Sequence, residues 1–209
     1  MVKLHDYLPS QNGWKVRVLL GLLGLSYETR IVSIFEGESH ADAFLALNPA
    51  GAVPVLELED GRAIAESNAI LTYLADGTSY LPVERFRHAK IMQWLFFEQY
   101  HIEPVIGSLR FWTLTGRLER NRALLAGKRD AGPRTLAAMN GALARTPYLA
   151  GNDLSIADIA AYAYSHRAED CGFLLAAYPA VSAWIGRLQD VVRDYPVHPY
   201  DIDPKSRAT

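Results

Sequence analysis

The stretch AVPVLELEDGRAIAESNAI, residues 52–70, decides the fold of the first part of the chain. Its apolar residues predict a core strand over 53–59 and a second strand over 62–65. The dipeptide Asp60-Gly61 between them is a strong signal for a β-hairpin. The helical spacing of SNAILTYLA, residues 67–75, predicts a helix directly after the hairpin.

Pro54 is unexpected within the first of these strands, because proline donates no backbone hydrogen bond and is rare in central strands. One explanation is a trans proline at a bulge or an edge. The other is a cis bond after Val53, which would leave the N–H and C=O of Val53 free to pair with an extended, peptide-like ligand. The residues of this stretch leave both explanations open.

The segments before residue 52 alternate between strand and helix patterns. Strands are predicted over 2–7 and 27–34, and helices from Asn12-Gly13 to Gly24 and over 40–49. The predicted order for the first part of the chain is therefore β-α-β-α-β-β-α.

A turn-rich stretch, DGTSYLPVE, separates this part from a second part in which only helices are predicted. Pro104 should kink the first of them, and Gly132-Pro133 casts doubt on the continuity of the second. We predict an α/β domain over residues 1–77, a linker over 78–84 and an all-helical domain over 85–209. The predicted helices cover 87–112, 121–145, 155–173 and 179–192.

Polar residues stand at two of the predicted helix starts. Ser67 and the free N–H groups of its helix can bind a carboxylate, and Glu66 just before it can receive an amine. Ser10 and Asn12 open the first helix, where they can donate to a thiolate that the helix dipole also favours. The alternative for each serine and for Asn12 is a plain loop or capping residue.

Composition excludes several classes of protein. The net charge is −2, from 21 basic and 23 acidic residues, and no basic stripe indicates a nucleic-acid partner. No segment has the length and apolarity of a membrane span, and the start lacks the pattern of a signal peptide. The single cysteine, Cys171, forbids an intrachain disulfide and fits a reducing cytoplasm. The histidines show no metal-ligand spacing.

Four motifs, in this order, resemble the glutathione S-transferase family from end to end: PSQNGWKVR, NPAGAVPVL, ESNAI and LSIADIAAY. The first is most similar to the PTPNG start of bacterial Nu-type members. The resemblance implies a thioredoxin-like α/β domain followed by an all-α domain, a homodimer, and glutathione as cosubstrate without a metal. In the last motif, Ser155 and Asp158 should form a capping box at a helix start.

The resemblance also implies how glutathione is bound. Pro54 is expected to be cis, with Val53 pairing with the cysteinyl backbone. Glu66 and Ser67 are expected to hold the γ-glutamyl end. His40 stands roughly where relatives have a basic residue for the glycyl end.

For the chemistry, the resemblance places Ser10 and Asn12 against the glutathione sulfur, which would attack an electrophile, a peroxide or a disulfide. Tyr7 is a second candidate for the activating group, ranked below Ser10 because it ends the first strand. Cys171 is expected to be an incidental buried thiol. Ala52 replaces the Lys or Gln that many relatives have before Val-Pro, which leaves a non-catalytic binding or regulatory relative as the first alternative. An isomerase or dehalogenase is the third option.

Overall fold

The computed structural model describes residues 1–207, which form two compact units. The first unit combines Met1–Asp76 with Tyr195–Ser206, and the second begins at Gly77 and extends to Asp194. The predicted domains differ from these units in two ways. Gly77 and the predicted linker belong to the second unit, and the C-terminal segment, predicted to be part of the helical domain, belongs to the first.

The first unit is built on a four-stranded sheet in the order β2-β1-β3-β4. Strand β1 (Val2–Asp6) is parallel to β2 (Tyr27–Ile31) and antiparallel to β3 (Val55–Glu57), which pairs in turn with antiparallel β4 (Ala63–Ala65). The predicted hairpin is thus confirmed. Because β3 starts at Val55, Pro54 precedes the central strand and does not interrupt its hydrogen bonds.

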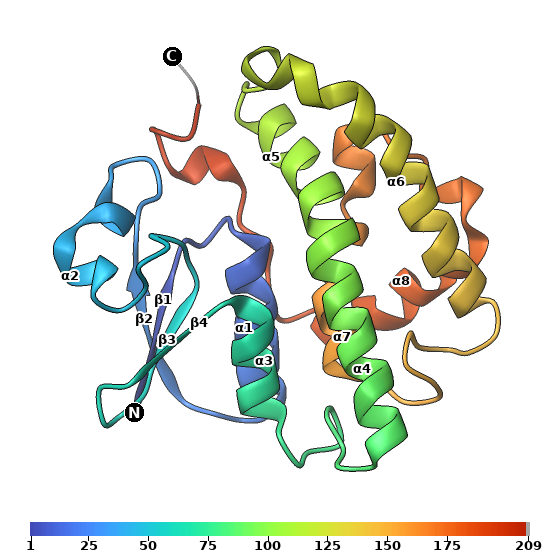
Figure 1. Ribbon diagram of the computed structural model, residues 1–209, viewed down its shortest axis with the longest axis horizontal. Coiled ribbons are helices and arrows are strands. Elements are labelled where there is room, and N and C mark those ends of the chain that lie inside the picture. The colour runs from blue at the N-terminus through green and yellow to red at the C-terminus, as the bar shows by residue number, and fades with distance from the viewer. Residues whose placement is uncertain (208–209) are drawn as a thin grey trace. The chain divides into compact units, whose positions relative to one another are not determined.

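Helices cover both faces of this sheet (Figure 1). Helices α1 (Gln11–Leu22) and α3 (Ser67–Ala75) lie side by side on one face, and the short α2 (Asp42–Leu45) lies on the other. Neighbouring residues of β3 point to opposite faces. Leu56 therefore packs with Leu4, Val16, Leu20 and Ile70, and Val55 packs with Val32 and Phe44.

The C-terminal segment Tyr195–Ser206 is held on the first unit by specific contacts. The indole Nε1 of Trp14 donates to the carbonyl of Tyr195 over 2.8 Å. The Tyr195 ring lies against Gly21, where a Cβ atom would stand 2.3 Å from the ring. These contacts join residues far apart in the chain, which explains why the sequence did not predict them.

The second unit is helical, as predicted. Its helices are α4 (Arg85–Phe97), a π-helical stretch (Glu98–Gly107), α5 (Ser108–Leu114), α6 (Arg122–Leu143), α7 (Ile156–Ser165) and α8 (Pro179–Val192). Pro104 lies in the π-helical stretch, so the backbone around it departs from a regular α-helix. The doubt about Pro133 was wrong, because α6 continues through it.

Helix α7 starts with the predicted capping box of Ser155 and Asp158. The buried Asp158 carboxylate also accepts hydrogen bonds from the Leu149 N–H at 2.8 Å and the Trp184 indole at 3.0 Å. The helix ends at Ser165, well before the predicted end. Cys171 accordingly lies in a separate 3₁₀ turn, where it is free and buried as expected. Burial raises the pKa of its thiol to about 11, which suits a packing role.

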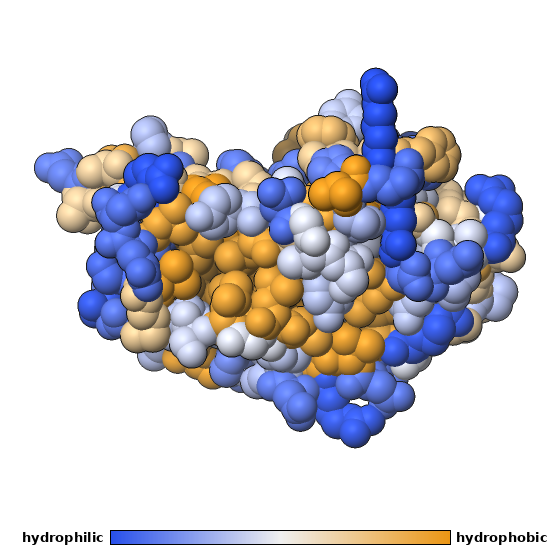
Figure 2. Space-filling view, turned by 90° about the horizontal axis from the view of Figure 1, so that it is seen from below, coloured by the Kyte–Doolittle hydropathy of each residue, from blue (hydrophilic) through white to orange (hydrophobic). Residues whose placement is uncertain are grey.

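Part of the surface is apolar. Figure 2 shows one face on which apolar residues are grouped and polar residues form the edges. In the second unit, the large apolar side chains exposed on or beside α4 and the π-helical stretch are Val83, Phe86, Phe96 and Tyr100. Within residues 1–207, none of the helices has the length and apolarity needed to cross a membrane.

Candidate functional site

The first part of the site is the N-terminal end of α1. The chain leaves β1 at Asp6 and turns at once, with the Ser10 N–H donating to the Tyr7 carbonyl over 2.7 Å. Ser10 is the extended N-cap residue, and its half-buried hydroxyl makes no capping hydrogen bond. Asn12 lies in the first helical turn, whose N–H groups have no intrahelical acceptor. The end of α1 thus offers a hydroxyl, an amide and the positive end of a helix dipole.

The second part is the N-terminal end of α3. Glu66 precedes the helix with φ of 64°, the only non-glycine residue with positive φ among residues 1–207. Such a conformation is costly for a residue with a side chain and is found mostly at functional sites. Ser67 is the first helical residue and is buried. Its hydroxyl donates to Oδ1 of Asn12 over 3.4 Å, so the starts of α1 and α3 meet here.

The third part is the loop before β3. The Val53–Pro54 bond is cis. Val53 lies outside the strands, and within residues 1–207 no backbone hydrogen bond joins its N–H or C=O. Asn48 fixes the loop, because its Nδ2 donates to the Ala52 carbonyl at 2.7 Å and its Oδ1 accepts from the Ala50 N–H at 3.1 Å. The backbone of Val53 is therefore positioned and available.

His40 lies beside this loop. It ends a 3₁₀ turn (Glu38–His40), is exposed, and its Nδ1 is 3.0 Å from the Ser39 hydroxyl. A Cβ atom on Gly51 would be 3.2 Å from Nε2 of His40, so the ring packs against the loop at that point. The structure thus brings the imidazole close to the segment that ends in Val53.

A buried ion pair supports the turn that carries Ser10, and the sequence did not predict it. The guanidinium of Arg17 binds the Asp6 carboxylate and also donates to the Leu8 carbonyl over 3.0 Å. Asp6 is fully buried, which raises its pKa, and Arg17 offsets part of that effect. Asp6 also faces Gly13, where a Cβ atom would be 1.7 Å from Oδ1. The glycine of the Asn12-Gly13 signal therefore makes room for a carboxylate.

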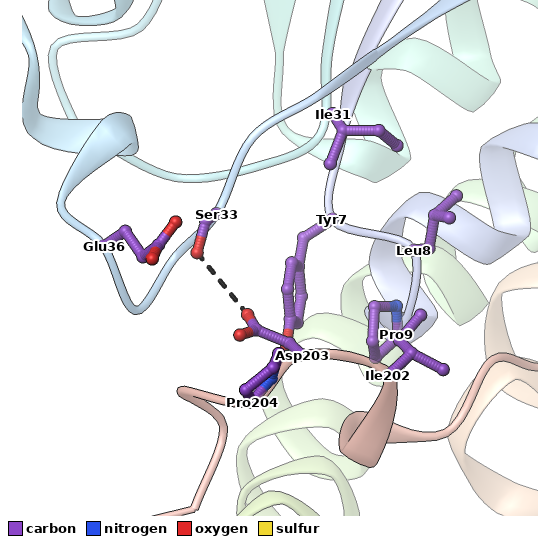
Figure 3. Close-up of a pocket in the computed structure, with 9 residues that line it drawn as sticks. All are labelled: Tyr7, Leu8, Pro9, Ile31, Ser33, Glu36, Ile202, Asp203 and Pro204. Atoms are coloured by element: carbon purple, nitrogen blue, oxygen red, sulfur yellow. Dashed lines mark hydrogen bonds between the residues drawn. The ribbon is translucent and has the colours of Figure 1, made fainter.

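Tyr7 occupies a different position from Ser10. Its ring is buried and packs edge-on against Phe35 at 5.7 Å, with the Tyr200 ring 6.2 Å away. It also lines a pocket of about 220 Å³ beside the turn (Figure 3). The other lining residues come from the turn, from β2 and the segment after it, and from the C-terminal segment: Leu8, Pro9, Ile31, Ser33, Glu36, Ile202, Asp203 and Pro204.

The candidate site therefore combines two helix N-terminal ends, an available backbone segment and an apolar pocket. Residues 1–207 contain no group of three or more His, Cys, Asp or Glu side chains arranged to hold a metal ion. The arrangement can bind an extended ligand with a carboxylate and stabilise an anion at Ser10 and Asn12.

Comparisons with known proteins agree with this architecture. Family models described as the N-terminal and C-terminal domains of glutathione S-transferase match residues 9–76 and 122–187. A glutathione S-transferase from Pseudomonas fluorescens has a crystal structure with a TM-score of 0.87 and 46% sequence identity, and the match covers 90% of this chain and 94% of that chain.

Two further relatives are similar over most of their length. The disulfide-bond oxidoreductase YfcG of Escherichia coli is 28% identical over 202 residues, which are 90% of each protein. A glutathione transferase family member from Pseudomonas fluorescens, solved with two glutathione bound, is 27% identical with a TM-score of 0.80 over 92% of this chain and 91% of that chain. Since both halves match the family's domain models and the whole architecture matches its solved structures, this chain belongs to the glutathione S-transferase family.

Proposed function

We propose that this protein binds glutathione at the site described above and uses its thiolate to reduce disulfides. The observation that carries the proposal is the 3.4 Å contact between Ser67 and Asn12, which joins the two helix starts. A γ-glutamyl carboxylate at α3 and a sulfur at α1 would then lie in one continuous site. The relative solved with two glutathione bound supports the choice of ligand.

Each part of glutathione has a candidate partner. The N–H and C=O of Val53 pair with the cysteinyl backbone as an added strand would. Glu66 receives the α-amino group and Ser67 the carboxylate of the γ-glutamyl end. His40 is the candidate for the glycyl carboxylate, where Ala52 offers no polar group. The His40 and Glu66 side chains are exposed, and Ser67 is the first residue of a helix. The N–H and C=O of Val53 make no backbone hydrogen bond within residues 1–207.

Ser10 and Asn12 are proposed to stabilise the thiolate. A free thiol has a pKa of about 8.5, so only a few per cent is ionised at neutral pH. Lowering the pKa by about two units requires roughly 2.7 kcal/mol of preference for the thiolate. One or two hydrogen bonds to a charged acceptor, together with a helix N-terminal end, supply that amount.

The proposed reaction is a two-step thiol–disulfide exchange. The bound thiolate attacks one sulfur of R–S–S–R, the S–S bond breaks, a glutathione–S–S–R bond forms, and the leaving R–S⁻ takes up a proton. A second glutathione thiolate attacks the glutathione sulfur of this mixed disulfide and releases the second R–SH. Two glutathione molecules lose two electrons and the disulfide gains them. The similarity to a disulfide-bond oxidoreductase favours this reaction over conjugation.

Calorimetry and a substrate panel test the proposal. The protein should bind glutathione, and Ser67→Ala should weaken binding by roughly 1–3 kcal/mol because a charged group loses its partner. Ser26→Ala, an exposed serine in the loop after α1, is the matched control and should bind like the wild type. Turnover of bis(2-hydroxyethyl) disulfide should exceed turnover of an aryl halide and of cumene hydroperoxide. Glutathione binding without any turnover would indicate the non-catalytic relative instead.

We also propose that the protein is a twofold homodimer in the cytoplasm. Each unit carries exposed aromatic side chains that support an interface: Tyr73 on α3 of the first unit, and Phe86 and Phe96 on α4 of the second. Such apolar surface normally marks an interaction site, and isologous dimers are the commonest oligomers. Sedimentation should give about twice the 23.2 kDa chain mass. A monomer at micromolar concentration would contradict the dimer but would not affect the catalytic proposal.

A further inference from the structure

The pocket beside the turn is formed by both ends of the chain (Figure 3). Its volume of about 220 Å³ is below the range of complete ligand sites, roughly 300–1,000 Å³, and suits a single small ring or a short chain. Leu8, Pro9 and Ile31 form apolar walls from the body of the first unit. The Ile202 side chain lies beside Pro9 and adds a wall from the C-terminal segment.

The position of the pocket relates it to the thiolate. Tyr7, Leu8 and Pro9 make up the turn that ends at Ser10, and the Ser10 N–H closes this turn on the Tyr7 carbonyl. A group in the pocket therefore contacts the three residues that directly precede Ser10. A second substrate that reacts with a sulfur at Ser10 has this pocket next to it.

The two charged side chains that line the pocket are both acidic. The lining includes the carboxylates of Glu36 and Asp203 and no cationic side chain. Lys205 partly balances Glu36, since its ammonium is 3.8 Å from Oε1. Asp203 has no ion pair within residues 1–207: its oxygens accept from the Ser33 hydroxyl at 3.4 Å and the Lys205 N–H at 2.9 Å. A carboxylate has about four acceptor positions, so Asp203 keeps capacity for a further donor.

We propose that Asp203 makes this pocket select second substrates whose apolar groups carry a cationic or hydrogen-bond-donating end over anionic ones. The inference rests on the proposed function, because it assigns the substrate class of that same site. The C-terminal segment contributes both the selecting carboxylate and the Ile202 wall, so specificity depends on residues at the far end of the chain.

Binding of small ring compounds tests the pocket without any reaction. In protein labelled at isoleucine methyl groups, benzylamine should shift the NMR signals of Ile31 and Ile202. These two signals are assigned by substituting each isoleucine in turn. Benzoate has the same ring and the opposite charge, and should bind roughly three- to tenfold more weakly, as one partly exposed carboxylate predicts. Asp203→Asn should bring the two affinities together. Asp201→Asn, an exposed carboxylate outside the lining, should leave the difference unchanged.

Turnover separates the subsite from the proposed function. Cystamine and 3,3′-dithiodipropionate are disulfides of similar size with opposite charge, and kcat/KM should favour cystamine roughly three- to tenfold in the wild type but not in Asp203→Asn. Equal values for the two disulfides, or isoleucine shifts elsewhere in the protein, would overturn the subsite and leave the function intact. Absence of glutathione binding would instead refute the function, and the subsite with it.

Discussion

Replacing Gly13 by alanine tests the packing beneath the site. A Cβ atom at this position would be 1.7 Å from Oδ1, 2.5 Å from Cγ and 2.9 Å from Oδ2 of Asp6. To restore ordinary contact, the carboxylate must move by roughly 1.5 Å or more. Asp6 is fully buried and bound to Arg17, so it has no solvent-facing rotamer that keeps this ion pair.

The magnitude follows from two opposing effects. Breaking a buried ion pair costs about 3–5 kcal/mol, because it leaves an uncompensated charge in the interior. Alanine has a higher helix propensity than glycine, which returns about 1 kcal/mol. We therefore expect Gly13→Ala to lower the free energy of unfolding by about 2–4 kcal/mol. It should also weaken activity, since Arg17 holds the Leu8 carbonyl in the turn before Ser10.

The assay is urea denaturation followed by circular dichroism, with Gly127→Ala as the control. Gly127 lies within α6, where an added Cβ atom would have no neighbour within 4 Å, so alanine there should stabilise the protein by about 0.5–1 kcal/mol. In an Asp6→Ala background the clash is gone, and Gly13→Ala should no longer destabilise. The reasoning is wrong if Gly13→Ala is as stable as the wild type. It is also wrong if Gly13→Ala lowers the free energy of unfolding by the same amount in the Asp6→Ala background as in the wild type.

Three further predictions concern single side chains. Ser10→Ala and Asn12→Ala should each raise the thiol pKa of bound glutathione by roughly one to two units, and the double variant should raise it further. The pKa is measured from thiolate absorbance near 240 nm against pH. If only Tyr7→Phe abolishes the low-pKa thiolate, the stabilising role belongs to Tyr7. Gln11 is buried with neither amide atom paired within residues 1–207, so Gln11→Met should raise the free energy of unfolding by about 1 kcal/mol, and a fall would show a hidden partner. Burial lowers the pKa of His166 to about 4, so as the pH falls the imidazole binds a proton in the unfolded state before it does so in the folded state. Between pH 7.5 and 4.5 the free energy of unfolding should therefore fall by about 2 kcal/mol more in the wild type than in His166→Gln. Equal losses in the two proteins would contradict this.

Local signals were enough to predict much of the first unit. The Asp60-Gly61 hairpin was predicted because turn residues and alternating apolar residues act over a few positions. The same holds for the Ser155–Asp158 capping box in the second unit, which needs four consecutive residues. Val53-Pro54 was recognised as a site candidate because a proline is unexpected within a predicted strand, and Glu66-Ser67 because polar residues stand at a predicted helix start.

Other features were decided only by the tertiary structure. Helix α6 continues through Pro133, and α7 stops at Ser165, because tertiary packing overrides local preference. The Asp6–Arg17 pair has no signature in the sequence, since either residue alone is ordinary at its position.

The pocket depends on contacts between distant parts of the chain. Trp14 binds the Tyr195 carbonyl, 181 residues away, and Ser33 meets Asp203 across 170 residues. The polar and proline-spaced C-terminal segment has no periodicity, so the sequence by itself determined neither its contacts nor the unit to which it belongs. Where it docks depends on the shape of a surface that exists only after β1, α1 and β2 have packed together, and this is why only the tertiary structure brings Asp203 to the pocket.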